Sequence, residues 1–408
     1  MKKIIILNIL LVIEIFAAGN GSPYSILGLG DFLLNPNTKI YGFGGLGYAY
    51  NSYFSVNYLN PAANSNLKLP RLEASFLYSG YNINEKYSSF YSNSNINGLA
   101  VGIPIEREIG ISVAAGMMPT TTMKNVYRDK VYTNNIKFEY ENNGNLSKLF
   151  IALAGNLSQN LSLGTSFDYY ILDKNKISRV YNEDYNLTNA EFKTNYHFNA
   201  IGYTFGVNIT NLNRILNIKD VDNATFSFVF SPKFDKLSDT SVTLRTFRGE
   251  EIGSDYSQSI DIAKGKTTLT KPMEFGIGFN TSFDEYMLGF DYRFIKTSDV
   301  QENNQSLDDY QKYVIYFEYS KLKPRNYWQT MPLRLSLSYE KTPYYSNNKR
   351  VNAIYFNIGS TLLLTKESGL DFAISYGKRG MGTNLEENII NVNIGIGFSE
   401  IWFIREEK

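Results

Sequence analysis

The chain has 408 residues, no cysteine, 40 basic and 39 acidic side chains and a net charge of +1. The balanced charge removes any general attraction for nucleic acid, and the absence of cysteine excludes disulfides and thiolate metal sites. Aromatic residues make up 15% of the chain, and most of them are tyrosine or phenylalanine. Tyrosine suits a membrane interface, because its apolar ring carries a polar tip.

The first 18 residues have the pattern of a secretory signal peptide. Lys2 and Lys3 form a basic start, residues 4–18 are almost all apolar, and residues 17–19 are small enough for a signal peptidase. A membrane anchor is the alternative, but the run is shorter than the roughly 20 apolar residues that a spanning helix needs. No later stretch of the sequence is long and apolar enough for such a helix, so the mature chain is either soluble or a closed barrel.

Residues 19–70 show little alternation and many glycines, among them Gly28 and Gly30, and they include the pair Asn60-Pro61. This composition predicts irregular backbone rather than barrel wall. A barrel of fourteen strands encloses more space than its own side chains fill. We therefore predict that residues 19–70 form a plug, or hatch, in the lumen.

From residue 71 onward, segments of about ten residues alternate between apolar and polar side chains. Residues 333, 335, 337 and 339 are Leu, Leu, Leu and Tyr, whereas residues 334, 336, 338 and 340 are Arg, Ser, Ser and Glu. A strand has a period of two, so one face is apolar and the other polar. Strands are expected to begin near residues 71, 94, 109, 148, 161, 195, 224, 272, 287, 311, 332, 351, 369 and 390.

These fourteen segments predict an all-β fold, an antiparallel 14-stranded transmembrane β-barrel over residues 71–399 followed by a periplasmic tail at 400–408. The connections are of two kinds. Most of one kind are short, and the other kind is long and polar, with the longest at 119–147, 173–194 and 233–271. Long loops of such barrels face outward, so both termini are expected in the periplasm and the chain in the outer membrane of a Gram-negative bacterium.

Several short motifs resemble those of a known family. They are Ser22-Pro23-Tyr24-Ser25, Gly28-Leu29-Gly30-Asp31, Asn60-Pro61-Ala62, Gly116-Met117-Met118-Pro119 and Trp402-Phe403. Together with the signal peptide and fourteen strands, they resemble the FadL-type long-chain fatty acid and hydrocarbon transporter family of outer-membrane barrels. Relatives associated with type IX secretion are included in this resemblance.

The resemblance implies a lumenal hatch that acts as a gate, and it places Asn60, Pro61, Gly28, Gly30 and Asp31 in that gate. It also implies a kink in the third strand that opens the wall sideways. Gly116 and Pro119 are the residues that would form this lateral opening, since one lacks a side chain and the other lacks an N–H donor. The alternative is that these two residues simply end the strand before a long loop.

No catalytic or metal-binding constellation stands out. The only histidine is His197, which rules out a multi-histidine site and is more simply a polar residue at the outer rim. Residues 220–223 lack the spacing of an EF-hand loop, and Gly42, Gly44 and Gly47 lack the strand-to-helix setting of a dinucleotide site. We therefore predict that the chain is not an enzyme and has no cofactor and no metal.

Charged residues on predicted strands are expected to face the lumen. Asp291 and Arg293 alternate with apolar residues, as do Arg334 and Glu340. Facing lipid, each charge would cost up to about 2–4 kcal/mol at mid-depth. Pairing of these charges with the hatch is a hypothesis.

The predicted function is passage of small molecules across the outer membrane, and a docking function is the alternative. In the first, a monomeric barrel in contact with outer-membrane lipid passes small apolar or amphipathic ligands, such as long-chain fatty acids, past the hatch. In the second, the barrel transports nothing and serves as a docking or assembly platform for a secretion-system or surface-protein partner, which the long polar loops also suit. Nucleic acid is not an expected partner.

Overall fold

The computed structural model describes residues 21–26, 30–84, 88–131, 136–182, 188–218, 221–247, 258–302, 305–365 and 367–399. The predicted signal peptide at 1–18 and the predicted tail at 400–408 lie outside the described residues.

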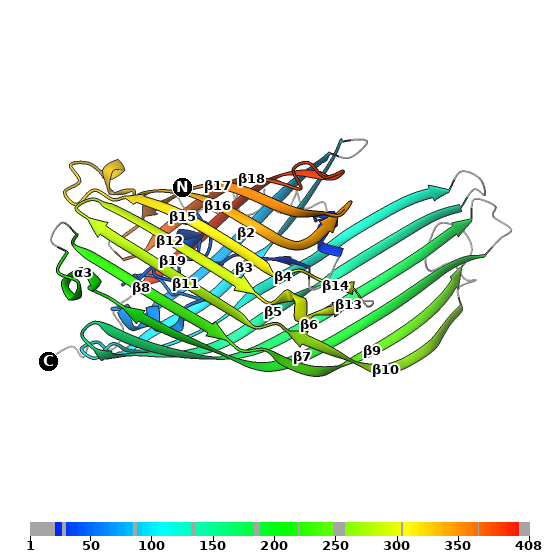
Figure 1. Cartoon of the computed structure of the whole chain (residues 1–408), viewed down its shortest axis with the longest axis horizontal. Coiled ribbons are helices and arrows are strands. Elements are labelled where there is room, and N and C mark those ends of the chain that lie inside the picture. Colours follow the sequence, from blue (N-terminus) through cyan, green and yellow to red (C-terminus); the bar gives the residue numbers. More distant parts are fainter. Residues whose placement is uncertain are drawn as a thin grey trace.

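Fourteen wall strands in the described residues form a closed antiparallel barrel, as the alternation of the sequence predicted (Figure 1). The wall consists of β2 (Arg71–Asn84), β3 (Ser88–Glu106), β4 (Ile111–Val131), β5 (Ile136–Ser158), β6 (Leu161–Asn182), β7 (Asn189–Ile209), β8 (Asn223–Ser231) continued by β9 (Phe234–Phe247), β10 (Gln258–Lys271) continued by β11 (Glu274–Phe283), β12 (Tyr286–Ile295), β15 (Tyr310–Tyr319), β16 (Leu333–Ser346), β17 (Lys349–Leu363), β18 (Gly369–Arg379) and β19 (Glu386–Ser399). The ring closes where β19 pairs with β2, from Ser399 opposite Arg71 to Glu386 opposite Asn84.

Two wall strands are interrupted by proline. Pro232 separates β8 from β9, and Pro272 separates β10 from β11. The breaks are level with each other, because Phe234 lies opposite Lys271 just above them and Ser231 lies opposite Glu274 just below. Proline has no N–H to donate to the ladder, which accounts for both interruptions.

The remaining elements are short. They are η2 (Pro23–Ile26), β1 (Asp31–Phe32), α2 (Thr38–Gly42), η3 (Pro61–Asn66), α3 (Leu212–Ile215), η4 (Thr297–Asp299), β13 (Gln301–Glu302), β14 (Gln305–Ser306) and η5 (Tyr327–Thr330). Within the described part of the chain, no helix has the length and hydropathy of a membrane span.

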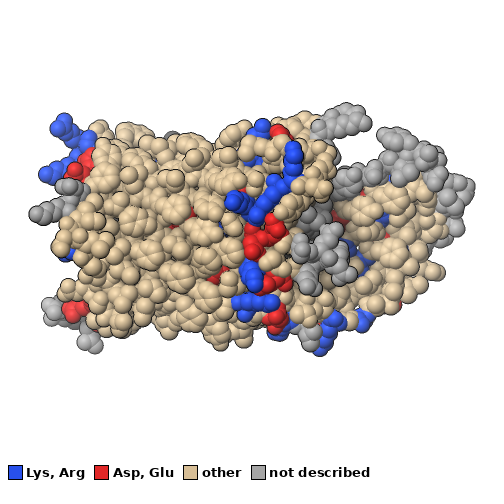
Figure 2. All heavy atoms as spheres, in the orientation of Figure 1, with Lys and Arg blue, Asp and Glu red and all other residues tan. Residues whose placement is uncertain are grey.

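The two faces of the wall differ as the alternation requires. On β16, Leu333 and Leu337 are exposed on the outside, whereas Arg334 and Ser338 are buried inside. Figure 2 shows the resulting outer surface, a wide uncharged wall bounded at one side by a band of Lys, Arg, Asp and Glu. An uncharged outer wall between charged margins is the arrangement of a transmembrane barrel.

The two ends of the barrel are unequal. At the short-turn end, β5 and β6 are joined by residues 159–160 and β11 and β12 by residues 284–285. At the opposite end, here called the extended end, β4, β5, β6, β7, β9 and β10 continue well past the other strands (Figure 1). These six strands form a protruding sheet, here called the extension.

The extension corrects the prediction of long polar loops at 119–147, 173–194 and 233–271. Most of these residues are in paired strands, for example Asn145 to Ile136 of β5 opposite Asp173 to Asn182 of β6. Their polarity resembles that of a loop because both faces of the sheet lie beyond the lipid. Ion pairs replace lipid contacts there, and Arg179 on β6 bonds Glu139 on β5 at 2.6 Å and Glu191 on β7 at 2.8 Å.

Leu337→Arg is expected to impair assembly of the barrel. Leu337 is 55% exposed and pairs with Ile315 and Phe356, two other exposed apolar residues at mid-strand. An arginine there costs about 2–4 kcal/mol at the bilayer midplane. The measurement is the heat-modifiable fraction of the protein in isolated outer membranes, and Leu337→Phe is the matched control. Equal assembly of the two variants would contradict the assignment of this face to lipid.

Candidate functional site

Residues 30–70 are here called the lumenal segment, because many of them are buried against inward-facing residues of the wall. They bond to inward-facing residues on different sides of the wall. The Thr38 hydroxyl bonds the Asn393 side chain on β19 at 2.6 Å, and the Asn280 amide on β11 donates to the carbonyl of Ala49 at 2.7 Å. These contacts connect the segment to strands on different sides of the wall.

Asparagine side chains form hydrogen bonds with backbone groups of this irregular segment. Asn37 is the N-cap of α2 and accepts from the backbone N–H groups of Lys39 and Ile40. Its amide donates to Ser55 at 2.6 Å and to the Glu73 carboxylate on β2 at 2.8 Å. One side chain thus starts a helix, crosslinks the segment and anchors it to the wall.

The predicted gate residues Asn60 and Pro61 form the start of η3. Asn60 is fully buried and accepts from the backbone N–H of Ala62 at 3.0 Å, and Pro61 occupies the first helical position. The Asn60 amide also donates to the carbonyl of Tyr48 at 2.7 Å and lies 2.6 Å from the amide of Asn208 on β7. The turn is therefore held both by its own segment and by the wall.

Two glycines on neighbouring strands form a flat seat for this turn. Gly164 on β6 lies directly opposite Gly206 on β7. A Cβ atom on Gly206 would come within 2.3 Å of the Asn60 Oδ1, and one on Gly164 within 2.4 Å of the Ala62 nitrogen. Only glycine leaves room for the segment at these two positions. Other inward-facing wall glycines approach the segment in the same way, namely Gly98, Gly102, Gly276, Gly278, Gly359 and Gly395.

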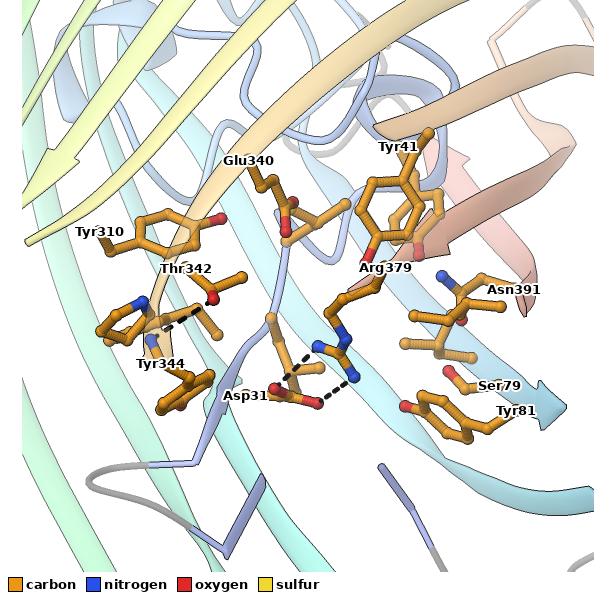
Figure 3. Close-up of a pocket in the computed structure, with 17 residues that line it drawn as sticks. Asp31, Tyr41, Ser79, Tyr81, Tyr310, Glu340, Thr342, Tyr344, Arg379 and Asn391 are labelled. Carbon is orange, nitrogen blue, oxygen red and sulfur yellow. Dashed lines mark hydrogen bonds and ion pairs between the residues drawn. The ribbon is translucent and has the colours of Figure 1, made fainter. Parts of the chain in front are cut away.

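Asp31, another predicted gate residue, is clamped by an arginine that the sequence did not single out. Arg379 on β18 bonds Asp31 through two hydrogen bonds of 3.0 and 3.1 Å (Figure 3). Arg379 also bonds Glu387 on β19 at 2.6 Å. The adjacent Gly30 has φ +83°, and its carbonyl accepts from the Tyr344 hydroxyl at 2.6 Å. Gly28 lies outside the described residues.

A small cavity with both charged and apolar lining residues adjoins this clamp. It measures about 60 Å³ and is lined by Asp31 and Leu34 of the segment and by wall residues that include Glu340 and Arg379 (Figure 3). Burial raises the pKa of the Asp31 carboxyl above its ordinary value, and the charge of Arg379 opposes this rise. The clamp is thus a charged contact in a confined site.

The inward orientation predicted for Asp291 and Arg293 is confirmed. Asp291 is fully buried and accepts from the backbone N–H of Gly47 in the lumenal segment at 2.7 Å. Arg293 bonds Glu274 on β11 at 2.9 Å and reaches the carbonyl of Leu33 at 3.4 Å. Both charges therefore serve the contact between wall and segment.

Gly116 and Pro119 do not end their strand, because β4 continues through both to Val131. Gly116 lies within the ladder and faces Ala100 on β3 and Phe150 on β5. The pairing of β4 with β5 continues beyond Pro119, with a shift in register at that residue. The interpretation of these residues as a strand end is therefore wrong.

The pairing of β4 with β3 does stop at this point. The last pair is Leu99 opposite Met117. Beyond it, the edge of β4 contacts the N-terminal part of the chain. Phe32 of β1 lies opposite Thr121, and the backbone N–H of Leu33 donates to the Thr120 carbonyl at 2.9 Å. The N-terminal residues thus take the place of β3 along this part of β4.

A second cavity lies on the other side of residues 32–33. It measures about 50 Å³ and combines apolar residues such as Leu59 and Met118 with the amines of Lys148 and Lys271. Lys271 donates to the Ser231 hydroxyl at 2.6 Å. An apolar pocket with a buried cation is chemically suited to an amphipathic anion.

The other motifs remain without a chemical role. His197 is exposed on the extension and bonds the Asp173 carboxylate at 2.5 Å. Gly44 and Gly47 have φ of +81° and +62° in tight turns of the lumenal segment. Across the described ranges, no group of three or more His, Cys, Asp or Glu side chains is placed to hold a metal ion.

Comparison with known proteins gives one family and one fold. The BamG family model matches residues 1–407. No curated protein sequence matches the chain.

Solved structures share the architecture at low sequence identity. The CymD monoaromatic hydrocarbon channel is 14% identical with a TM-score of 0.63 over 91% of this chain and 99% of that one. A Pseudomonas aeruginosa FadL homologue is 11% identical with a TM-score of 0.60 over 91% and 98%. The Ralstonia pickettii toluene transporter TbuX is 13% identical with a TM-score of 0.60 over 90% and 98%. The fold is therefore that of FadL-like outer-membrane barrels.

Proposed function

The chain belongs to the BamG family, and we propose that it is a plugged outer-membrane barrel whose extension holds partner proteins at the cell surface during their docking or assembly. The observation that carries this proposal is the sheet that protrudes at the extended end of the barrel (Figure 1).

The extension exceeds what the membrane requires. A transmembrane strand needs about 9–11 residues, and β11, β12 and β15 have 10 each. Strands β4 to β7 have 21, 23, 22 and 21 residues. The surplus of roughly ten residues in each adds about 30 Å of strand beyond the bilayer. A rigid sheet of this size outside the membrane provides a surface for another protein.

The contacts between the lumenal segment and the wall support the same proposal. Two small cavities of about 60 and 50 Å³ lie beside residues 31–34. Passage of an apolar molecule through these sites would require the Asp31–Arg379 clamp or the Asn60 turn to release. Binding of a protein to the extension requires no such movement.

The test removes the outermost hairpin and leaves the barrel. Replacing residues 234–271 by a short turn should leave a heat-modifiable barrel, because β8 and β11 pair directly below the proline breaks. Proteins that co-purify with the full chain in mild detergent should be lost from this variant. Unchanged co-purification would contradict the proposal. An association with a secretion system, expected from the resemblance, stays a prediction, as does the monomeric state.

The second candidate function is the passage of small apolar or amphipathic molecules, such as long-chain fatty acids, gated by Asn60, Pro61, Gly30 and Asp31. The cavity with Lys148 and Lys271 favours it, because Met118 lines that cavity immediately after the last β3–β4 pair. In this mechanism a ligand would leave sideways near Gly116 and Pro119. The hydrocarbon channel and the toluene transporter named above provide the analogy.

Uptake of a labelled long-chain fatty acid distinguishes the two functions. A deletion strain with reduced uptake, restored by the parent chain but not by a Lys271→Met variant, would favour passage. Uptake that is the same in the deletion strain as in the parent strain would argue against passage. If the 234–271 replacement variant also loses its co-purifying proteins, docking is the supported function.

A further inference from the structure

The last strand of the extension, β10, has one edge that no described strand pairs with, here called the open edge. One edge of β10 pairs with β9 from Gln258 opposite Thr246 to Lys271 opposite Phe234. Along its other edge, no described residue is in register with it or forms a backbone hydrogen bond to it. The first nine residues of β10 are all exposed, and Figure 1 shows the strand at the border of the sheet. An exposed strand edge carries unpaired N–H and C=O groups that can template another strand.

The inner face of the extension carries an apolar row that ends at this edge. The register aligns Tyr140, Ser178, Phe192, Leu244 and Ile260 across five neighbouring strands. Tyr140, Phe192 and Ile260 are 46%, 45% and 58% exposed. These residues share the side of the sheet that faces the lumen lower down, so they are turned away from lipid. Exposed apolar side chains gathered in a row of this kind can contact a partner protein.

The outer face of the same strands is charged. On β10, Asp261, Lys264 and Lys266 lie on this face, since the register places them opposite Thr243, Ser241 and Asp239. Lys264 and Asp261 are paired at 3.1 Å but remain 74% and 61% exposed. The edge therefore has an apolar side and a side on which lysines outnumber acids.

We propose that the open edge of β10 binds an amphipathic β-strand of a partner protein, with apolar residues continuing the inner row and acidic residues facing Lys264 and Lys266. This inference rests on the proposed docking function and names its contact surface. Main-chain hydrogen bonds would provide affinity, and the alternation of side chains would provide specificity. A β-bulge between Asp261 and Ala263 shifts the register of the pair formed by β9 and β10.

A second copy of the chain fits this edge less well. In the register centred on Gly265, antiparallel pairing of two β10 edges would place Lys264 of one copy opposite Lys266 of the other. Like charges directly opposite each other destabilise a strand pair. Lysines on an edge also oppose self-association in natural sheets. The charge of the edge thus selects an acidic partner strand over a copy of itself.

The experiment uses a defined peptide and the purified full chain in detergent. The probe is a fluorescent peptide of about 12 residues that alternates valine or tyrosine with glutamate. A peptide of the same composition with the alternation scrambled is the control probe. Fluorescence anisotropy should show binding of the alternating peptide, roughly tenfold tighter than that of the scrambled one. Hydrogen exchange should slow at the amides of residues 258–267.

Charge reversal tests whether the acidic side chains of the peptide face Lys264 and Lys266 on β10. The double variant Lys264→Glu with Lys266→Glu should bind the glutamate peptide roughly tenfold more weakly than the parent does. It should bind an alternating lysine peptide more tightly. The matched control is Lys323→Glu with Arg325→Glu, two exposed residues at the short-turn end, which should change neither affinity. A circular dichroism spectrum and heat-modifiability equal to those of the parent show that the variants are folded.

Three results would overturn the inference. They are equal affinity for alternating and scrambled peptides, unchanged hydrogen exchange in β10, and a sedimentation mass showing a dimer that the alternating peptide does not dissociate. Failure of the docking function is a separate result. If the full chain binds the peptide at β10 but the 234–271 replacement variant loses no co-purifying protein, the docking function is contradicted. The binding site on β10 is then still supported.

Discussion

A chain that lacks residues 19–70 but keeps its first 18 residues should form a folded barrel with an open lumen. The strand ladders close without the lumenal segment, and several buried ion pairs join wall to wall. Lys312 bonds Glu340 and Arg334 bonds Glu318, each at 2.7 Å. These charges would line a water-filled pore once the segment is gone. Planar-bilayer recordings should change from little current to discrete open-channel steps, and cells should become sensitive to large antibiotics.

The chain with residues 234–271 replaced by a turn is the control for this deletion. It loses a similar mass but keeps the lumenal segment, so it should stay closed. A heat-modifiable 19–70 deletion variant that conducts no better than the parent would show that the segment does not block the lumen. Gated passage would then lose its mechanism, whereas docking on the extension would be unaffected.

The transmembrane part of the fold was predictable because its two faces meet different solvents. Lipid outside and a polar lumen inside impose a period of two on β12, β16, β18 and β19, and the structure confirms those strands. The extension was not predictable by the same rule. The start of β5 was expected near 148 but lies at Ile136, because beyond the bilayer no lipid forces one face to be apolar.

The candidate site was only partly predictable, since its contacts join distant parts of the chain. Asn60 and Asp31 were proposed as gate residues, but their partners Asn208 and Arg379 lie 148 and 348 positions away. Gly206 gave no signal, because a glycine inside a strand usually indicates a bulge or a bend. Only the position of the lumenal segment in the structure shows that Gly206 packs against the Asn60 turn.

Gly206→Ala and Asn60→Ala should each loosen the lumenal segment. The new methyl group on Gly206 would lie 2.3 Å from the Asn60 Oδ1, and relief of such overpacking costs about 1–3 kcal/mol. Asn60→Ala removes the cap of η3, worth about 1 kcal/mol, and leaves the Tyr48 carbonyl without its donor. Both variants should lower the temperature at which the folded form is lost on gels and should raise the leak current.

The double variant separates a direct contact from two independent defects. Asn60→Ala removes the oxygen atom that the Gly206 methyl group would meet, so the combined loss of stability should be smaller than the sum of the single losses. Gly265→Ala is the matched control, since a Cβ atom there has no neighbour within 4 Å, and it should behave like the parent. Strict additivity, or an equal effect of Gly265→Ala, would show that the Asn60 turn is not seated on Gly206. The lumenal segment would then be held mainly by its charged contacts, the Arg379 clamp on Asp31 and the bond from Gly47 to Asp291.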